Sequence, residues 1–142
     1  MTGPLSDVTV LDLTSVISGP LATSILADQG ARVIKVESPN GDSMRMAGAL
    51  KGGVSSLFSS INRNKESIAL DLRAPEAIEI INKIAARADI CIQNYRPGVV
   101  EKLGIGYEHL KKINPELIYA SISGVGAEGP YSGRRVYDPV IQ

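Results

Sequence analysis

Residues 8–37 read VTVLDLTSVISGPLATSILADQGARVIKVE and carry the strongest fold signal in the sequence. This stretch begins with a mostly apolar, β-branched run over 8–13, which is typical of a strand. A turn leads into an apolar helical stretch over 21–30, with Pro20 suited to the first helical position and Gly30 to the helix end. The final residues, ARVIKVE, are again strand-like. This order of strand, helix and strand predicts a βαβ unit with parallel, buried strands.

The rest of the chain continues the alternation of strands and helices. A loop rich in glycine and proline runs over 38–53, and a short helix or irregular segment follows over 54–65. The clearest helix is predicted over 74–88, where apolar residues recur at helical spacing. The other predicted elements are strands over 67–72, 89–93 and 117–123, a turn over 94–98, and short helices over 99–104 and 107–114. The sequence therefore predicts an α/β fold in one domain over 1–142, with a Rossmann-like, mainly parallel sheet of about five strands and flanking helices.

The overall charge excludes several classes of protein. The 142 residues include 15 basic and 15 acidic side chains, so the formal net charge is zero. That balance argues against a basic nucleic-acid binder and against a polybasic membrane-surface protein. The hydrophobic fraction of 44% suits a globular domain. No apolar run approaches the roughly 20 residues that span a bilayer. We expect neither nucleic acid nor membrane as a partner.

The single cysteine and the single histidine are expected to be structural. Cys91 lies in a short apolar run, ADICIQ, which indicates a buried strand residue. A catalytic thiol would need a nearby base, and His109 lies in the polar run YEHLKK. One free thiol, with no basic segment followed by an apolar stretch at the N-terminus, is typical of a cytoplasmic protein.

Two patterns suggest a dinucleotide site, and their context argues against it. Residues 124–129 spell G-x-G-x-x-G after a strand, but Pro130 follows where the dinucleotide fingerprint requires a helix. Glu37 ends the second strand of the βαβ unit, where Rossmann dehydrogenases hold the ribose. The first strand–helix turn lacks the glycine triplet, however. We therefore expect 124–129 to be a loop and Glu37 to be a solvated carboxylate at a strand end.

Basic residues recur in the loops that follow the predicted strands. In a parallel sheet these loops leave at one edge, so their side chains would form a basic rim. Each residue taken alone is better explained as a solvated surface charge, but their recurrence on one side suits a polyanionic ligand such as a phosphorylated nucleotide. The residues are Arg73, Arg96, Lys102, Arg134 and Arg135.

Read together, these loops resemble one family. The chain is similar to the N-terminal part of the family III CoA-transferases, the CaiB/BaiF group, which also contains the formyl-CoA transferases and α-methylacyl-CoA racemases. The resemblance runs in order over essentially the whole chain. The stretches that carry it are VLDLTSVISGP, LADQGARVIKVESPNGD, NRNKESIALDLR, NYRPGVVEKLGIGY, NPELIYASISGVGAEGPY and RRVYDPVIQ.

The resemblance implies an enzyme that moves coenzyme A from an acyl-CoA donor to a carboxylic acid. In such enzymes an aspartate attacks the thioester, and anhydride and enzyme-bound thioester intermediates follow. Acyl-CoA and a small carboxylic acid would be the substrates, with no metal or redox cofactor. The full-length form would be an interlocked homodimer. Two alternatives are an enzyme like the α-methylacyl-CoA racemases and a non-catalytic module that binds CoA or a nucleotide.

The same resemblance implies roles for residues in the first half of the chain. Val16 and Ile17 match the turn that lines the adenine and pantetheine channel. Leu70 and Arg73 match the loop that flanks the adenine and its phosphates. Ser38 departs from the pattern, since some members carry an arginine there that contacts the nucleotide.

Further matching positions lie later in the chain. Asn94, Tyr95 and Arg96 match an asparagine–aromatic turn beneath the CoA. Lys102 and Arg135 match basic positions near the CoA phosphates, in agreement with the basic rim.

The end of the chain separates transferase from racemase. Racemases carry a histidine before the aspartate at Tyr137-Asp138, and the histidine serves as a proton carrier. The tyrosine favours the transferase, because it removes the base that titrates near neutral pH. Asp138 and Pro139 also form a good helix start, so the chain is expected to stop within a helix. The nucleophilic aspartate is expected beyond Gln142, which would leave this chain inactive by itself.

Overall fold

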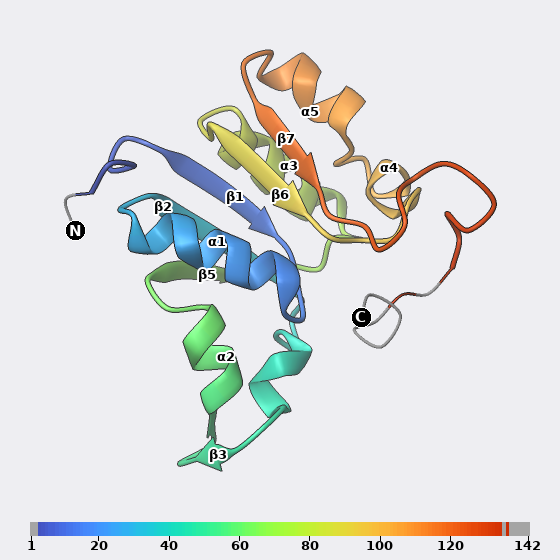
Figure 1. The fold of residues 1–142 in the computed structure, drawn as a ribbon. Coiled ribbons are helices and arrows are strands. Elements are labelled where there is room, and N and C mark those ends of the chain that lie inside the picture. Colours follow the sequence, from blue (N-terminus) through green and yellow to red (C-terminus); the bar gives the residue numbers. More distant parts are fainter. Residues whose placement is uncertain (1–2, 135, 137–142) are drawn as a thin grey trace.

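A computed structural model describes residues 3–134 and 136 of the chain. Five parallel strands form one sheet in the order β5-β2-β1-β6-β7. This arrangement confirms the predicted α/β fold with a parallel sheet (Figure 1). The strands are β1 Thr9–Leu13, β2 Arg32–Glu37, β5 Lys65–Ala69, β6 Ile90–Gln93 and β7 Ile118–Ser121.

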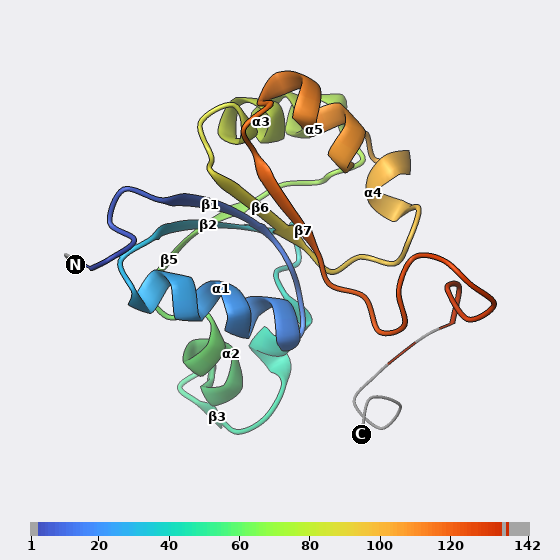
Figure 2. The same ribbon diagram turned by 45° about the horizontal axis from the view of Figure 1, so that its top comes forward.

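Helices cover both faces of the sheet. Helix α1, Ser18–Asp28, lies on one face, and helices α3, Pro75–Ala85, and α5, Tyr107–Ile113, lie on the other (Figure 2). Helix α4, Val99–Lys102, follows β6 after the turn over 94–98. Each crossover from one strand to the next parallel strand therefore carries a helix, as parallel pairing requires.

The connection between β2 and β5 contains more structure than the predicted loop. It begins with a 3-10 helix, η1, over Ser43–Met46. A small antiparallel hairpin of β3, Leu50–Lys51, and β4, Val54–Ser55, follows, and then helix α2, Ser56–Ile61. The hydroxyl of Ser55 caps α2 by accepting from the Phe58 amide. These elements project from the main sheet (Figure 1).

Two hydrophobic clusters pack against the two faces of the sheet. The cluster under α1 includes Val10, Val33 and Ala27. The larger cluster lies under α3 and α5 and includes Leu11, Ile81 and Leu110. Alternate residues of each strand supply the two clusters, because successive side chains point to opposite faces. The predicted apolar face of 74–88 is confirmed, with Ile81, Ala85 and Ala88 buried.

Several predicted boundaries differ from the structure by a few residues, and two of them have a clear cause. Helix α1 begins at Ser18, ahead of Pro20, and its first helical hydrogen bond runs from the Leu21 amide to the Ile17 carbonyl. Pro20 fits because amides in the first turn have no helical partner to lose. Strand β5 spans Lys65–Ala69 instead of 67–72, because its pairing with β2 ends at Glu37.

No helix in the described part of the chain has the length and hydropathy needed to cross a bilayer. Cys91 is buried in β6, as predicted, and burial raises the pKa of its thiol to about 12. His109 lies exposed on α5, with Nε2 3.1 Å from Oδ1 of Asn82. The structure thus places neither residue in a nucleophile–base pair.

Candidate functional site

The strand order creates a crevice at the carboxyl edge of the sheet. The connection from β1 leads to β2 on one side, whereas β6 lies on the other side of β1. After β1 the chain runs to α1 on one face of the sheet, and after β6 it runs to α5 on the other face, so the two connections diverge beyond their first residues. Open α/β sheets bind ligands at this switch point, because the diverging loops leave room between them.

A cavity of about 250 Å³ occupies this edge of the sheet. Residues from three segments line it: the turn after β1, the 38–46 segment after β2, and the turn after β6. Its lining includes Thr14, Ser15, Glu37, Ser38, Asp42 and Tyr95.

Asn94 joins the turns that follow β1 and β6. Its Oδ1 accepts from the Ser15 amide at 2.9 Å, and its Nδ2 donates to the Ser15 carbonyl at 2.8 Å. The side chain thus fixes both backbone groups of Ser15. The next residue, Val16, has a φ of +68°, which is strained for a β-branched residue. The turn over 14–17 is therefore held in one specific conformation beside the cavity.

Four residues predicted for the site are brought together by these contacts. Val16 and Ile17 follow Ser15 directly, and Tyr95 follows Asn94 and lines the cavity. The Tyr95 amide donates to Oε1 of Gln93, which orients the start of the turn. Burial raises the pKa of the Tyr95 phenol, so the hydroxyl stays protonated at neutral pH.

Other predicted site residues lie farther along the same edge. Leu70 packs against the hydrophobic cluster under α3. Arg73 is exposed after the edge strand β5 and forms an ion pair with Asp71, which lowers the pKa of Asp71. Arg96 and Lys102 are exposed in and after the turn that follows β6.

The predicted basic rim is only partly formed in the described residues. The loops that carry Arg73, Arg96 and Arg134 do leave the parallel sheet at its carboxyl edge. Strands β2 and β1 separate β5 from β6, however, so Arg73 and Arg96 lie on opposite sides of the crevice. Arg134 stacks over the ring of Tyr131. Arg135, Tyr137, Asp138 and the predicted helix start at Asp138-Pro139 lie outside the described residues.

The glycine-rich stretch 124–129 is an exposed loop, as predicted. Gly126 and Gly129 adopt φ values of +85° and +91° there, and no helix follows within the described residues. The stretch therefore lacks the helix N-terminus that a pyrophosphate site requires.

The expectation of a solvated Glu37 was wrong. Its side chain is buried and accepts hydrogen bonds from Arg45, from the Ser67 hydroxyl and from the Asp42 amide. Burial alone would raise the pKa of Glu37, but these donors outweigh it and bring the pKa to about 2. A carboxylate engaged in this way holds the 38–46 segment against the sheet.

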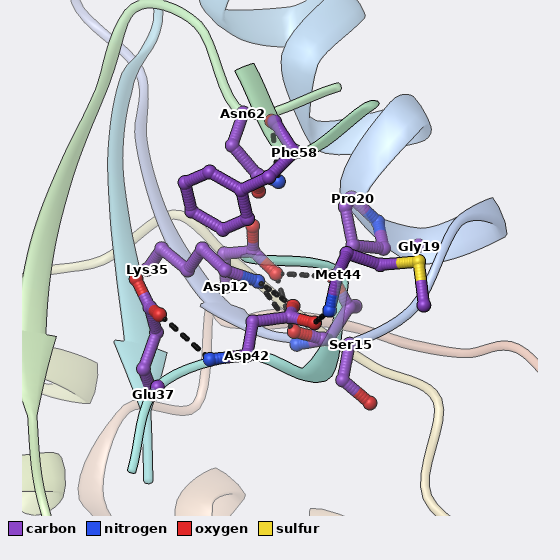
Figure 3. A network of polar contacts seen from close by, with 12 residues as sticks. Asp12, Ser15, Gly19, Pro20, Lys35, Glu37, Asp42, Met44, Phe58 and Asn62 are labelled. Atoms are coloured by element: carbon purple, nitrogen blue, oxygen red, sulfur yellow. Dashed lines mark hydrogen bonds and ion pairs between the residues drawn. The ribbon is translucent and has the colours of Figure 1, made fainter. Parts of the chain in front are cut away.

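The sequence did not lead us to expect a mostly buried cluster of charged side chains on the α1 face of the sheet (Figure 3). Lys35 lies 2.9 Å from Asp42, and Lys65 lies 3.1 Å from Asp12, with all four side chains almost fully buried. The signal was present in the strand sequences, since a charged residue inside a strand of a parallel sheet has no solvent face. The charged cluster consists of Asp12, Lys35, Glu37, Asp42, Arg45 and Lys65.

Within residues 3–134 and 136, no group of three or more histidine, cysteine, aspartate or glutamate side chains is arranged to hold a metal ion. The polar groups at the crevice are instead amides, hydroxyls, one phenol and the buried ion pairs. Such groups can bind and orient a polar organic ligand through hydrogen bonds.

Comparison with known proteins agrees with this architecture. The model of "CoA-transferase family III" matches residues 5–142. An acetyl-CoA:oxalate CoA-transferase of Acetobacter aceti is 47% identical over 99% of this chain and 36% of its own length. The human succinyl-CoA:glutarate CoA-transferase is 47% identical over 96% of this chain and 32% of its own length.

Solved structures show the same similarity. A CAIB/BAIF family protein from Brucella suis superposes with a TM-score of 0.94 and 42% identity, over the whole of this chain and 39% of that one. The chain thus spans roughly a third of the length of its relatives. Because the family model covers nearly every residue, the chain belongs to the family III CoA-transferases.

Proposed function

We propose that this chain forms the N-terminal, CoA-binding part of an enzyme that transfers coenzyme A from an acyl-CoA donor to a carboxylic acid. The main support is the crevice at the switch point, where the family residues Val16, Ile17, Asn94 and Tyr95 lie together. A crevice between diverging loops is where Rossmann-like sheets take nucleotide ligands, and the CoA-transferase names of the relatives agree with such a ligand.

The crevice would bind the nucleotide and pantetheine parts of CoA. The strained turn at Val16 and Ile17 presents backbone groups to the ligand, and Tyr95 offers an aromatic wall. Arg96 and Lys102 lie on the β6 side, where their charges would attract the CoA phosphates. On the far side of the crevice, Leu70 and Arg73 would flank the adenine, and Arg135 would add a further cation.

The chemistry follows from covalent catalysis by a carboxylate. An aspartate attacks the acyl-CoA carbonyl, which forms a mixed anhydride and releases the CoA thiolate. The thiolate then attacks the aspartyl carbonyl, which frees the donor acid and leaves an enzyme thioester. The acceptor carboxylate displaces the thiolate to give a second anhydride, and CoA attacks its acyl group to release the new acyl-CoA. Backbone amides in glycine-bearing loops would stabilise the oxyanions.

The nucleophile is proposed to lie beyond Gln142. The family's nucleophile lies in a short glycine–aspartate loop that matches no segment of this chain. Five aspartates in other segments are instead engaged in ion pairs or hydrogen bonds within the fold. These residues are Asp12, Asp28, Asp42, Asp71 and Asp89.

The remaining parts of the proposal concern the whole enzyme. The relatives are named for oxalate, glutarate and mesaconate, so we propose a small carboxylic acid as acceptor. An interlocked homodimer would complete the acyl pocket. The free, buried Cys91 suits a reducing compartment, and we place the enzyme in the cytoplasm.

The test uses the full-length protein. Titration calorimetry with CoA should show saturable binding, and CoA at about 100 times its Kd should stabilise the fold by about 2.7 kcal/mol. Acyl-CoA donors are then incubated with oxalate, glutarate, mesaconate and other small acids, and new thioesters are identified by mass spectrometry. Absence of CoA binding would overturn the proposal. Binding without transfer to any acceptor would favour the non-catalytic module.

A further inference from the structure

A buried lysine connects two walls of the crevice. The Lys35 side chain is 1% exposed, and its Nζ donates to the Thr14 carbonyl at 2.8 Å and pairs with Asp42 Oδ2 at 2.9 Å. Thr14 belongs to the turn after β1, and Asp42 belongs to the 38–46 segment after β2. Both residues line the 250 Å³ cavity. One ammonium group thus joins the two segments that border the site on the β2 side (Figure 3).

Lys35 contacts the 14–17 turn, whose conformation is already restricted by other hydrogen bonds. The amide and hydroxyl of Thr14 donate to Asp12 Oδ1, so its carbonyl is left to accept from Lys35. The strained Val16 follows two residues later. A shift of the Thr14 carbonyl would therefore pass directly into the turn that forms the crevice.

On the other side, Asp42 organises the 38–46 segment. Its Oδ1 caps η1 by accepting from the Met44 amide at 3.0 Å, and its own amide donates to Glu37 at 2.9 Å. Within the described chain, Asp42 Oδ2 has the Lys35 ammonium as its counter-charge at 2.9 Å and accepts no hydrogen bond. The position of η1 is thus set by Lys35 and by Glu37, two residues on the same face of β2.

Stability alone is a weak reason for such a pair. Two buried charges lose their hydration, and apolar residues of similar volume often serve the fold equally well. The Lys35 ammonium supplies something that apolar packing does not, because it contacts the Thr14 carbonyl in one loop and Asp42 Oδ2 in another. This link between two loops lies at the edge of the ligand crevice, where it can serve ligand binding.

We propose that Lys35 and Asp42 are positioning residues that set the separation of the 14–17 turn and the 38–46 segment for CoA binding. This inference rests on the proposed function, because the ligand is CoA. Neither residue is required to touch the thioester. Both act through the backbone groups and side chains that they hold at the crevice.

The test is the double variant Lys35→Met/Asp42→Asn in the full-length enzyme. It removes both charges together, so no unpaired buried charge remains, and the amide oxygen of the introduced asparagine would still be able to cap η1. We expect the KM for acyl-CoA to rise on the order of ten-fold, with kcat changed less than about two-fold, because misplaced binding groups weaken ground state and transition state alike. The matched control is Arg32→Met/Glu66→Gln, which removes an exposed pair at the opposite end of β2 and should leave the KM unchanged.

Hydrogen exchange keeps the proposal testable if the double variant folds poorly. In the isosteric Asp42→Asn variant, which keeps an oxygen beside the Lys35 ammonium, the amides at position 42 and of Met44, Arg45 and Ala47 should exchange faster, while those of α3 keep their protection. Uniformly faster exchange would mean a purely structural role and would overturn the inference. A folded double variant with the wild-type KM would overturn it as well. A wild-type protein that binds no CoA would instead overturn the proposed function itself.

Discussion

At the scale of single residues, the site depends on polar side chains that hold backbone in place. Asn94 fixes both backbone groups of Ser15, and the neighbouring Val16 keeps a φ of +68°. A strained valine costs about 1–3 kcal/mol and persists only where its surroundings enforce it. The two hydrogen bonds between Asn94 and the Ser15 backbone supply part of the constraint that keeps Val16 in this conformation.

Replacing Asn94 by alanine should therefore loosen the turn. Loss of two hydrogen bonds should lower the free energy of unfolding by about 1–2 kcal/mol, and we expect the KM for acyl-CoA to rise. Urea denaturation and steady-state kinetics measure the two effects. Asn82→Ala is the matched control, because Asn82 makes an exposed contact to His109 away from the crevice. Equal effects of the two substitutions on the KM would contradict the assignment of Asn94 to the site.

Glu37 makes the stability depend on acid pH. Its pKa falls from 4.5 in an unfolded chain to about 2 in the fold. The stabilisation is therefore complete above pH 4.5 and disappears as the pH falls through 2. At pH 7 the free energy of unfolding of the wild type should exceed that of Glu37→Gln by about 3 kcal/mol, and the difference should shrink between pH 4.5 and 2.

Denaturation curves at pH 7, 4 and 3 measure this difference directly. Glu66→Gln is the control, because Glu66 forms an exposed ion pair with Arg32 and such pairs contribute little. A difference between wild type and Glu37→Gln that stays constant down to pH 3 would show that the hydrogen bonds to Glu37 do not depend on its charge.

At the scale of elements, the start of α1 and the end of β1 are packed against each other without spare room. A Cβ on Gly19 would lie 2.4 Å from Cβ of Thr14. Thr14 is itself buried and is the first residue of the turn after β1. The glycine at the second position of α1 therefore allows the helix to begin at Ser18 in close contact with Thr14. This close approach fixes the distance between α1 and the turn that borders the crevice.

Gly19→Ala should push that turn away from its position. We expect a loss of about 1–3 kcal/mol of stability from overpacking, together with weaker CoA binding by calorimetry. Gly133→Ala is the control, since nothing lies within 4 Å of a Cβ there. If Gly19→Ala bound CoA as tightly as Gly133→Ala, the turn would not need its observed position.

At the scale of the whole molecule, the parallel sheet has an apolar face toward α3, and the charged cluster lies on its other face. The α3 face of the sheet is lined by apolar side chains such as Leu11, Leu13 and Val36. On the α1 face, apolar residues occupy the amino end, while Asp12, Lys35 and Glu37 occupy the carboxyl end. Charge is thus concentrated at the end of the sheet where the crevice opens.

Cys91 reports on the integrity of this sheet. It lies in β6 between β1 and β7, is fully buried, and has a pKa raised to about 12. Because the thiolate is the reactive form, iodoacetamide at pH 8 should label Cys91 only when the sheet opens. Mass spectrometry should find negligible labelling in native protein and complete labelling in urea, with Cys91→Ser as the unlabelled control. Rapid labelling of native protein would contradict the buried placement.

Much of the fold was predictable from local sequence. The βαβ unit over 8–37 was visible because β-branched runs, a proline and a terminal glycine all act over a few residues. The amphipathic α3 was visible for the same reason. The hairpin of β3 and β4 was not, because each strand has only two residues and depends on neighbouring η1 and α2. The family resemblance named residues of the crevice, but Ser15, Lys35 and Asp42 were not among them.

Local sequence is enough to specify the parallel α/β architecture, the buried state of Cys91 and the loops at the carboxyl edge, because hydrophobic periodicity and turn residues are local signals. Which charges meet depends on how distant segments fold together. Lys35 and Asp42 pair because β2 and the 38–46 segment fold against each other, and Lys65 reaches Asp12 from a strand 53 positions later in the chain. Such pairing depends on strand order and register. Glu37 looked solvated in sequence and is buried in the fold for the same physical reason, because its partners Arg45 and Ser67 are brought to it by the packing of other elements.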